Sequence, residues 1–206
     1  MKTFIKIVAL SATIATAIGT AHAQDTANSV VTANATVPNT CYIRSIDGIT
    51  GTGSLVNGTA GTTSSATLSY ANGLVDTATA LSTSKTTALN VSAYCNYALA
   101  PVKLTSDNNG MVNTATTPTS GTFNKRVNYT ASLSGWGTAS NATLTTTGTA
   151  TSNTAGAALV GTPVTAAEAV NTTNAVLQIV TTGSGTTPML AGTYSDVLRV
   201  TFGPAS

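Results

Sequence analysis

The stretch ALNVSAYCNYALAPVKLTSDNNG, residues 88–110, decides the fold class of this chain. In its first half, apolar side chains occupy every second position, at Leu89, Val91, Ala93 and Cys95. A period of two is typical of a β-strand with one buried face. Val102 and Leu104 begin a second strand, and residues 107–110 (Asp-Asn-Asn-Gly) predict a tight hairpin turn after it, because Asn-Gly accepts positive φ angles.

Further segments repeat this alternation along the chain. They are residues 31–37, 127–133, the apolar run 175–180 and residues 194–202. In the last of these, one strand face carries Tyr194, Leu198, Val200 and Phe202, and the other carries Val197, Arg199 and Thr201. The Thr/Ala/Gly/Asn-rich region 139–158 fits either polar strands or a long loop. Short strands separated by turn residues predict an all-β antiparallel sandwich.

Residues 1–23 have the pattern of a secretory signal peptide. Lys2 and Lys6 precede an apolar run over residues 7–18, and Ala21-His22-Ala23 supplies a small-x-small cleavage site. We therefore expect an exported protein that starts at Gln24. Its six basic and six acidic residues give no net charge, so we expect no nucleic-acid partner.

The same cleavage removes His22, the only histidine of the chain. Histidine is the commonest general base and metal ligand, so we expect no enzymatic activity, no catalytic residue, no metal site and no cofactor. The carboxylates show no spacing that marks a glycosidase pair, although a sandwich can bring distant ones together. They are Asp25, Asp47, Asp76, Asp107, Glu168 and Asp196.

Cys41 and Cys95 are the only cysteines. An even count in an exported chain predicts a disulfide, which would close a loop of 54 residues (95 minus 41) and stabilise the fold by about 4 kcal/mol. Trp136, between two glycines, fits an exposed sugar-stacking platform or a core anchor, and we favour the core. The adjacent pair Lys125-Arg126 predicts a solvated strand start.

Three segments together resemble a known family. They are VVTANATVPNTC (residues 30–41), an alternating strand that runs into a cysteine; the stretch 88–110 quoted above; and LAGTYSDVLRVTF (residues 190–202), whose A-G-x-Y-x-D turn leads into the last strand. In this order they look like the spore coat protein U-like domain, the subunit type of archaic chaperone–usher pili. FNKRVNYTASL (residues 123–133) is similar to the family's middle strand.

The resemblance implies an immunoglobulin-like sandwich that lacks its final strand and is completed by donor-strand exchange. Residues 24–40 would be the N-terminal donor segment and first strand, and residues 41–206 the pilin-like domain. The inserting side chains would be Val31, Ala33, Ala35 and Val37, and the last strand would line the acceptor groove with Tyr194, Leu198, Val200 and Phe202. The implied partners are other copies of the chain or related pilins, a periplasmic chaperone and an outer-membrane usher.

The expected function is thus that of a structural subunit of an adhesive pilus, exported through the periplasm to the cell surface and acting in adhesion and biofilm formation. Two alternatives stay open from the residues alone. One is a self-complete secreted sandwich that binds carbohydrate or matrix through loops near Trp136. The other is a hydrolase whose carboxylate pair is assembled in space.

Overall fold

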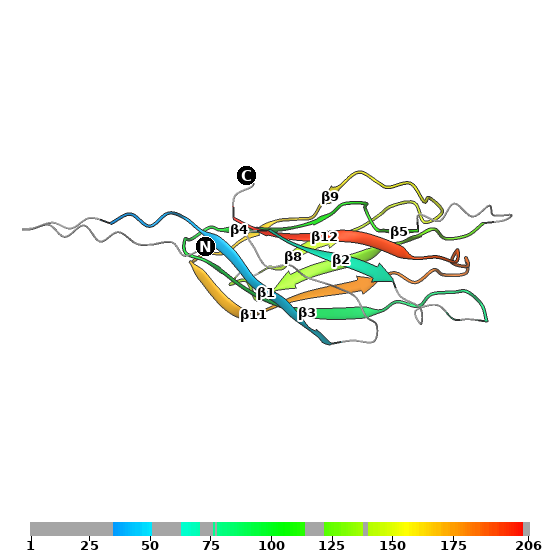
Figure 1. Cartoon of the computed structure of the whole chain (residues 1–206), viewed down its shortest axis with the longest axis horizontal. Coiled ribbons are helices and arrows are strands. Elements are labelled where there is room, and N and C mark those ends of the chain that lie inside the picture. The colour runs from blue at the N-terminus through cyan, green and yellow to red at the C-terminus, as the bar shows by residue number, and fades with distance from the viewer. Residues whose placement is uncertain are drawn as a thin grey trace, which may run out of the picture. The chain divides into compact units, whose positions relative to one another are not determined.

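The computed structural model of the chain describes residues 35–50, 63–70, 76, 78–113, 122–137 and 140–203. Within these residues it contains twelve β-strands and no helix, which confirms the predicted all-β class. The chain divides into two compact units, residues 1–37 and residues 38–206, and every strand belongs to the second unit. Figure 1 shows the strands in their order along the chain.

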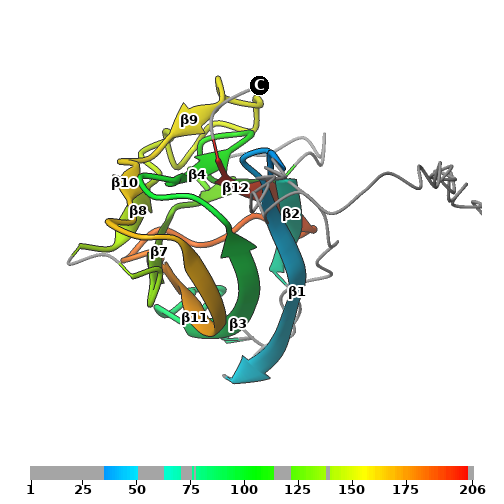
Figure 2. The same cartoon turned by 90° about the vertical axis from the view of Figure 1, so that its left-hand side faces the viewer.

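The strands form two sheets, and every strand pair is antiparallel. The first sheet has the order β1-β3-β11-β7-β8. Figure 2 shows this sheet curving around one side of the sandwich. Its strands are β1 (Cys41–Thr50), β3 (Thr86–Cys95), β11 (Val170–Thr181), β7 (Tyr129–Ser134) and β8 (Ala142–Thr145).

The second sheet is built around β12, the last strand. Its order is β10-β4-β12-β5-β6, with β2 paired to β12 and β9 paired to β4. These strands are β2 (Thr63–Tyr70), β4 (Pro101–Ser106), β5 (Met111–Asn113), β6 (Arg126–Val127), β9 (Leu159–Val160), β10 (Val164–Thr165) and β12 (Tyr194–Phe202). At one side of the sandwich β1 and β2 lie next to each other, and each is an edge strand of its sheet (Figure 2).

The core lies between the two sheets, where apolar residues of both meet. Every second residue of β12 from Tyr194 to Phe202 is buried, which confirms the predicted face of the last strand. In β3 the alternation from Leu89 to Cys95 is likewise buried, as its period of two predicts. The two sheets therefore share one apolar interior, as in a β-sandwich.

Residues 107–110 form a turn, but the predicted tight hairpin is wrong. β4 and β5, on either side of this turn, both pair with the same edge of β12: Ser106 lies opposite Leu198 and Val112 lies opposite Ser195. Five residues lie between Ser106 and Val112, whereas only two lie between their partners Ser195 and Leu198 on β12. The turn is therefore a large bulge. Positive φ angles occur at Asn109 and Gly110, as the Asn-Gly pair predicts.

The region 139–158, which fits either polar strands or a loop, contains one short strand, β8, followed by a loop with turns that reaches to β9. The predicted strand 31–37 is only partly described: Ala35 and Val37 belong to no strand and are exposed, Val37 to 75%, whereas Val31 and Ala33 lie outside the described residues.

Candidate functional site

The two cysteines form the predicted disulfide. Cys41 starts β1 and lies directly opposite Cys95 at the end of β3, so the bond fastens an edge strand to its neighbour. Both cysteines are buried. A buried disulfide indicates an oxidising environment such as the periplasm or the extracellular space.

The residues expected to line an acceptor groove lie in β12 and point into the core. Tyr194, Leu198, Val200 and Phe202 are all buried. One edge of β12 pairs with β4 and β5, and the other pairs with β2 from Tyr194 to Thr201. Between these two residues, β12 therefore has no open edge, and a new strand can reach its backbone only if β2 gives up this pairing.

Tyr194 fixes the corner before β12. Its hydroxyl hydrogen is shared between the carbonyl oxygens of Leu190, at 2.6 Å, and Asn124, at 2.9 Å. These two bonds fasten the turn before β12 and the segment before β6 to the start of the last strand. Burial raises the pKa of Tyr194, because the phenolate form would lose its hydration.

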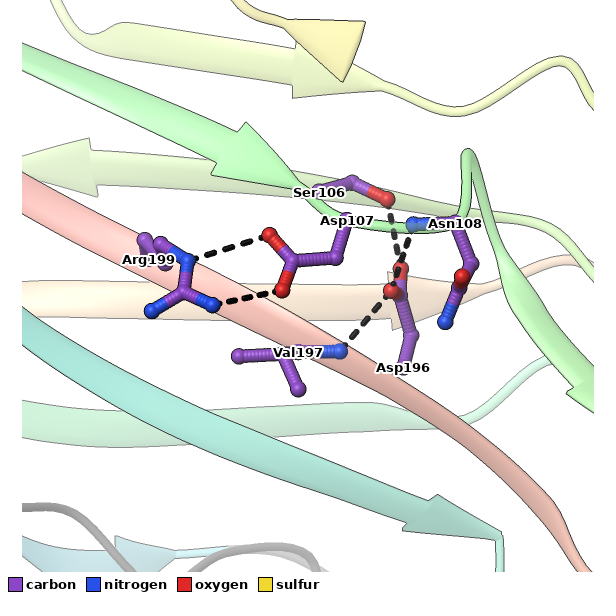
Figure 3. Close-up of polar contacts among 6 residues, drawn as sticks. All are labelled: Ser106, Asp107, Asn108, Asp196, Val197 and Arg199. Carbon is purple, nitrogen blue, oxygen red and sulfur yellow. Dashed lines mark hydrogen bonds and ion pairs between the residues drawn. The ribbon is translucent and has the colours of Figure 1, made fainter. Parts of the chain in front are cut away.

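Asp196, two residues further on, fills the bulge at residues 107–110 (Figure 3). It is 1% exposed. Its Oδ1 accepts the backbone N–H groups of Asn108 (3.0 Å) and Val197 (2.8 Å), and its Oδ2 accepts the hydroxyls of Ser106 (2.5 Å) and Tyr129 (2.8 Å). A bulge leaves backbone donors without ladder partners, and this carboxylate supplies the missing acceptor for Asn108.

Asp107 lies at the same bulge but is engaged elsewhere. Both its carboxylate oxygens bind Arg199, Oδ1 to Nε at 3.0 Å and Oδ2 to Nη2 at 2.6 Å (Figure 3). The fold thus brings Asp107 and Asp196 to one corner, which their separation in the sequence does not reveal. A glycosidase pair needs both carboxyl groups to reach a substrate, whereas Asp196 is buried under four donors and Asp107 is held by a guanidinium.

Arg126 is buried, so the expectation of a solvated strand start is wrong for this residue. Only 5% of it is exposed. Its Nη1 donates to the carbonyl oxygens of Asn108 and Asn109, and its Nη2 donates to that of Thr154 at 2.6 Å. Desolvation lowers the pKa of the guanidinium, and the negative charge of Asp196 partly offsets this shift. Arg126 therefore ties the bulge to the segment that follows β8.

Trp136 is a core residue, as we favoured. Its side chain is fully buried, and its ring lies 4.1 Å from that of Phe202, measured between centroids. The alternative of an exposed sugar platform at Trp136 is thereby wrong. Elsewhere in the described part of the chain, no three His, Cys, Asp or Glu residues gather as metal ligands.

The comparisons with known proteins identify no relative. The chain matches no family model, no curated protein and no solved structure. Among the described residues, there is no helix with the length and apolar character needed to cross a membrane.

Proposed function

We propose that the protein is a structural subunit of an extracellular adhesive fibre of the chaperone–usher type, in which each subunit donates its N-terminal segment to the next. In this proposal the sandwich is immunoglobulin-like, and the fibre serves surface adhesion and biofilm formation. Head-to-tail strand addition is heterologous and does not close, so its product is a fibre.

One observation carries the proposal. Residues 31–37 alternate as a half-buried strand does, yet Ala35 and Val37, its described apolar members, are exposed and join neither sheet. A segment with a strand's pattern, whose described apolar residues pair with neither sheet, is suited to complete another domain. The bond of the Tyr194 hydroxyl to the carbonyl oxygen of Leu190, four residues upstream, is similar to the tyrosine corner of immunoglobulin-type sandwiches and supports this subtype.

The acceptor in this proposal is the side of the sandwich where β1 and β2 lie. Among the described strands, β1 pairs only with β3, and β2 pairs only with β12. A donor strand can pair with β12 only after β2 has released its hydrogen bonds to β12. The donor then forms these bonds in place of β2. The exchange is close to balanced in backbone hydrogen bonds, so side-chain burial decides its direction. A periplasmic chaperone would hold this side before assembly, and an usher would export the fibre.

A matched pair of substitutions tests the donor assignment. Ala35→Asp would place a charge on the inserting face, and burial of an unpaired carboxylate would block polymerisation. Thr36→Asp adds the same charge on the opposite face of the segment and should leave polymerisation intact. The measurement is size-exclusion chromatography with light scattering, followed by electron microscopy of the polymer. Fibres from Ala35→Asp like those of wild type, or equal loss in both variants, would contradict the proposal.

A further inference from the structure

The outer face of the five-stranded sheet carries an aromatic and cationic cluster near the disulfide. We call Tyr42, Arg44, Tyr94 and Asn171 the outer-face cluster. Tyr42, Tyr94 and Asn171 lie directly opposite one another on the neighbouring strands β1, β3 and β11. Tyr42 is 41% exposed, whereas its neighbours in β1, Cys41 and Ile43, are buried in the core.

The members of this cluster hold one another in place. The rings of Tyr42 and Tyr94 have centroids 6.1 Å apart, with their planes inclined by 36°. The guanidinium carbon of Arg44 lies 4.9 Å from the centroid of the Tyr94 ring. Arg44 Nη1 also donates to Asn171 Oδ1 at 2.8 Å. The side chains are thus arranged before any ligand arrives, which lowers the entropic cost of binding.

A hollow of about 240 Å³ adjoins the cluster and is lined by Arg44, Tyr94, Asn96, Ala169, Val170 and Asn171. This volume lies below the ~300–1,000 Å³ of sites for drug-sized molecules, so it suits one small ring. The lining combines an aromatic surface, an aliphatic side chain and two amides. Such a mixture fits a ligand with one apolar face and several hydroxyl groups.

Arg44 brings an uncompensated positive charge to this hollow. Within the described residues the single ion pair is that of Arg199 with Asp107, so Arg44 has no carboxylate partner there. It uses one of its five N–H donors on Asn171, whose Nδ2 makes no hydrogen bond to the described residues. A guanidinium with free N–H donors can bind a carboxylate in bidentate geometry, through two parallel hydrogen bonds.

We propose that the outer-face cluster is a binding site for a carboxylate-bearing sugar. The carboxylate binds the free N–H groups of Arg44, the C–H face of the sugar ring packs on the Tyr94 ring, which Tyr42 supports, and a hydroxyl group binds the amide of Asn171. The Asn96 amide is held by the backbone of Thr40 and Pro38 and forms part of the wall of the hollow. A phosphate polymer fits less well, because a single arginine on a chain without a basic field gives little attraction. Two members of the cluster, Tyr42 and Arg44, belong to β1 on the proposed acceptor side, but their side chains are exposed on the outer face, whereas the proposed exchange concerns the edge and the buried face of β12. The binding proposal does not depend on the proposed fibre.

The test is isothermal titration calorimetry of the whole protein with short oligogalacturonates and with the methyl esters of the same oligomers, which measures the affinity for each. The ester keeps the ring and removes the charge, so we expect it to bind at least about tenfold more weakly. Arg44→Gln should lower affinity for the acid by about tenfold or more, and Tyr42→Ala should weaken both ligands. Lys103→Gln, which removes a charge from β4 of the other sheet, should change nothing.

Thermal unfolding of each variant is measured in parallel. Arg44→Lys serves as a second variant that keeps the charge but cannot bind a carboxylate in bidentate geometry. We expect Arg44→Lys to bind weakly while it unfolds near the wild-type temperature. No binding to wild type, equal binding of acid and ester, or equal losses from Arg44→Gln and Lys103→Gln would overturn the proposal. So would an Arg44→Lys variant with full affinity. None of these results bears on whether the protein forms fibres.

Discussion

The replacement Asp196→Asn tests the role assigned to the buried carboxylate at the bulge. Asparagine has the same shape, so the change leaves packing in place and alters only the hydrogen bonds. Its one carbonyl oxygen can still accept the N–H groups of Asn108 and Val197. Its NH₂ group then faces the hydroxyls of Ser106 and Tyr129, which now donate to Oδ2 and would have to reverse.

The expected cost follows from these four bonds. Hydrogen bonds to a charged group contribute about 1.5–3 kcal/mol each, and the substitution removes the charge from all four and reverses two. We expect a loss of about 2–4 kcal/mol in the free energy of unfolding. That is a large share of the ~5–15 kcal/mol typical of a folded domain.

Asp107→Asn is the matched control, since it removes the same charge from the same corner. The ion pair of Asp107 with Arg199 is partly exposed, with 32% and 44% of the two side chains accessible. Exposed pairs of this kind contribute about 0–1 kcal/mol.

The assay is urea unfolding at neutral pH with the disulfide intact. The fluorescence of the single tryptophan, Trp136, reports on the core. A shift of the midpoint without a change of slope measures stability alone. The assigned role of Asp196 is refuted if Asp196→Asn costs less than about 1 kcal/mol, or no more than Asp107→Asn does.

Three further predictions address the disulfide, the bulge and the pH dependence. Replacing both cysteines of the Cys41–Cys95 bond by serine should lower the free energy of unfolding by about 4 kcal/mol in the same urea assay, and an unchanged midpoint would contradict it. Gly148→Ala should lower the free energy of unfolding by about 1–3 kcal/mol, because its Cβ would lie 2.5 Å from both the Asn109 carbonyl oxygen and Arg126 Cδ. An unchanged free energy of unfolding would contradict this prediction. Burial, and then the charge of Asp196, raises the pKa of Tyr129 above its usual value of 10.0. The buried neutral phenol therefore contributes to the free energy of unfolding below pH 10, and this contribution is lost as the pH rises above 10. Urea unfolding from neutral pH to above pH 10 should show a decline in stability that is smaller in Tyr129→Phe than in wild type. An equal decline in both proteins would refute the role of Tyr129.

The strands that follow a strict apolar period of two could be predicted from the sequence. Residues 89–95 show it without interruption, and residues 194–202 show it with a single polar member, Asp196; both segments are central strands. β2 could not be found in this way, since TSSATLSY contains few apolar residues and shows no apolar period of two. The short strands β5, β9 and β10 each have two or three residues, too few to show a period.

The polar network at the bulge was beyond sequence reasoning for a different reason. The A-G-x-Y-x-D turn points to Tyr194 and Asp196, but nothing local shows that Asp196 meets Ser106 and Tyr129. The prediction for Arg126 is wrong because it rests on the general rule that adjacent charged residues are solvated. Its burial depends on backbone carbonyls from residues 108, 109 and 154, which only the folded chain brings together.

The outer-face cluster also follows from strand register. Tyr42 and Asn171 are far apart in the sequence, and they flank Tyr94 only because β1 and β11 pair with opposite edges of β3. The disulfide could be predicted from the sequence, since two cysteines have one possible pairing.

The most direct test of the account is the molar mass of the protein purified from a periplasmic extract, measured by size-exclusion chromatography with light scattering. The account predicts polymers when the protein is produced alone and a one-to-one complex when a cognate periplasmic chaperone is co-expressed. A soluble monomer that is stable without any partner would contradict the proposed strand exchange.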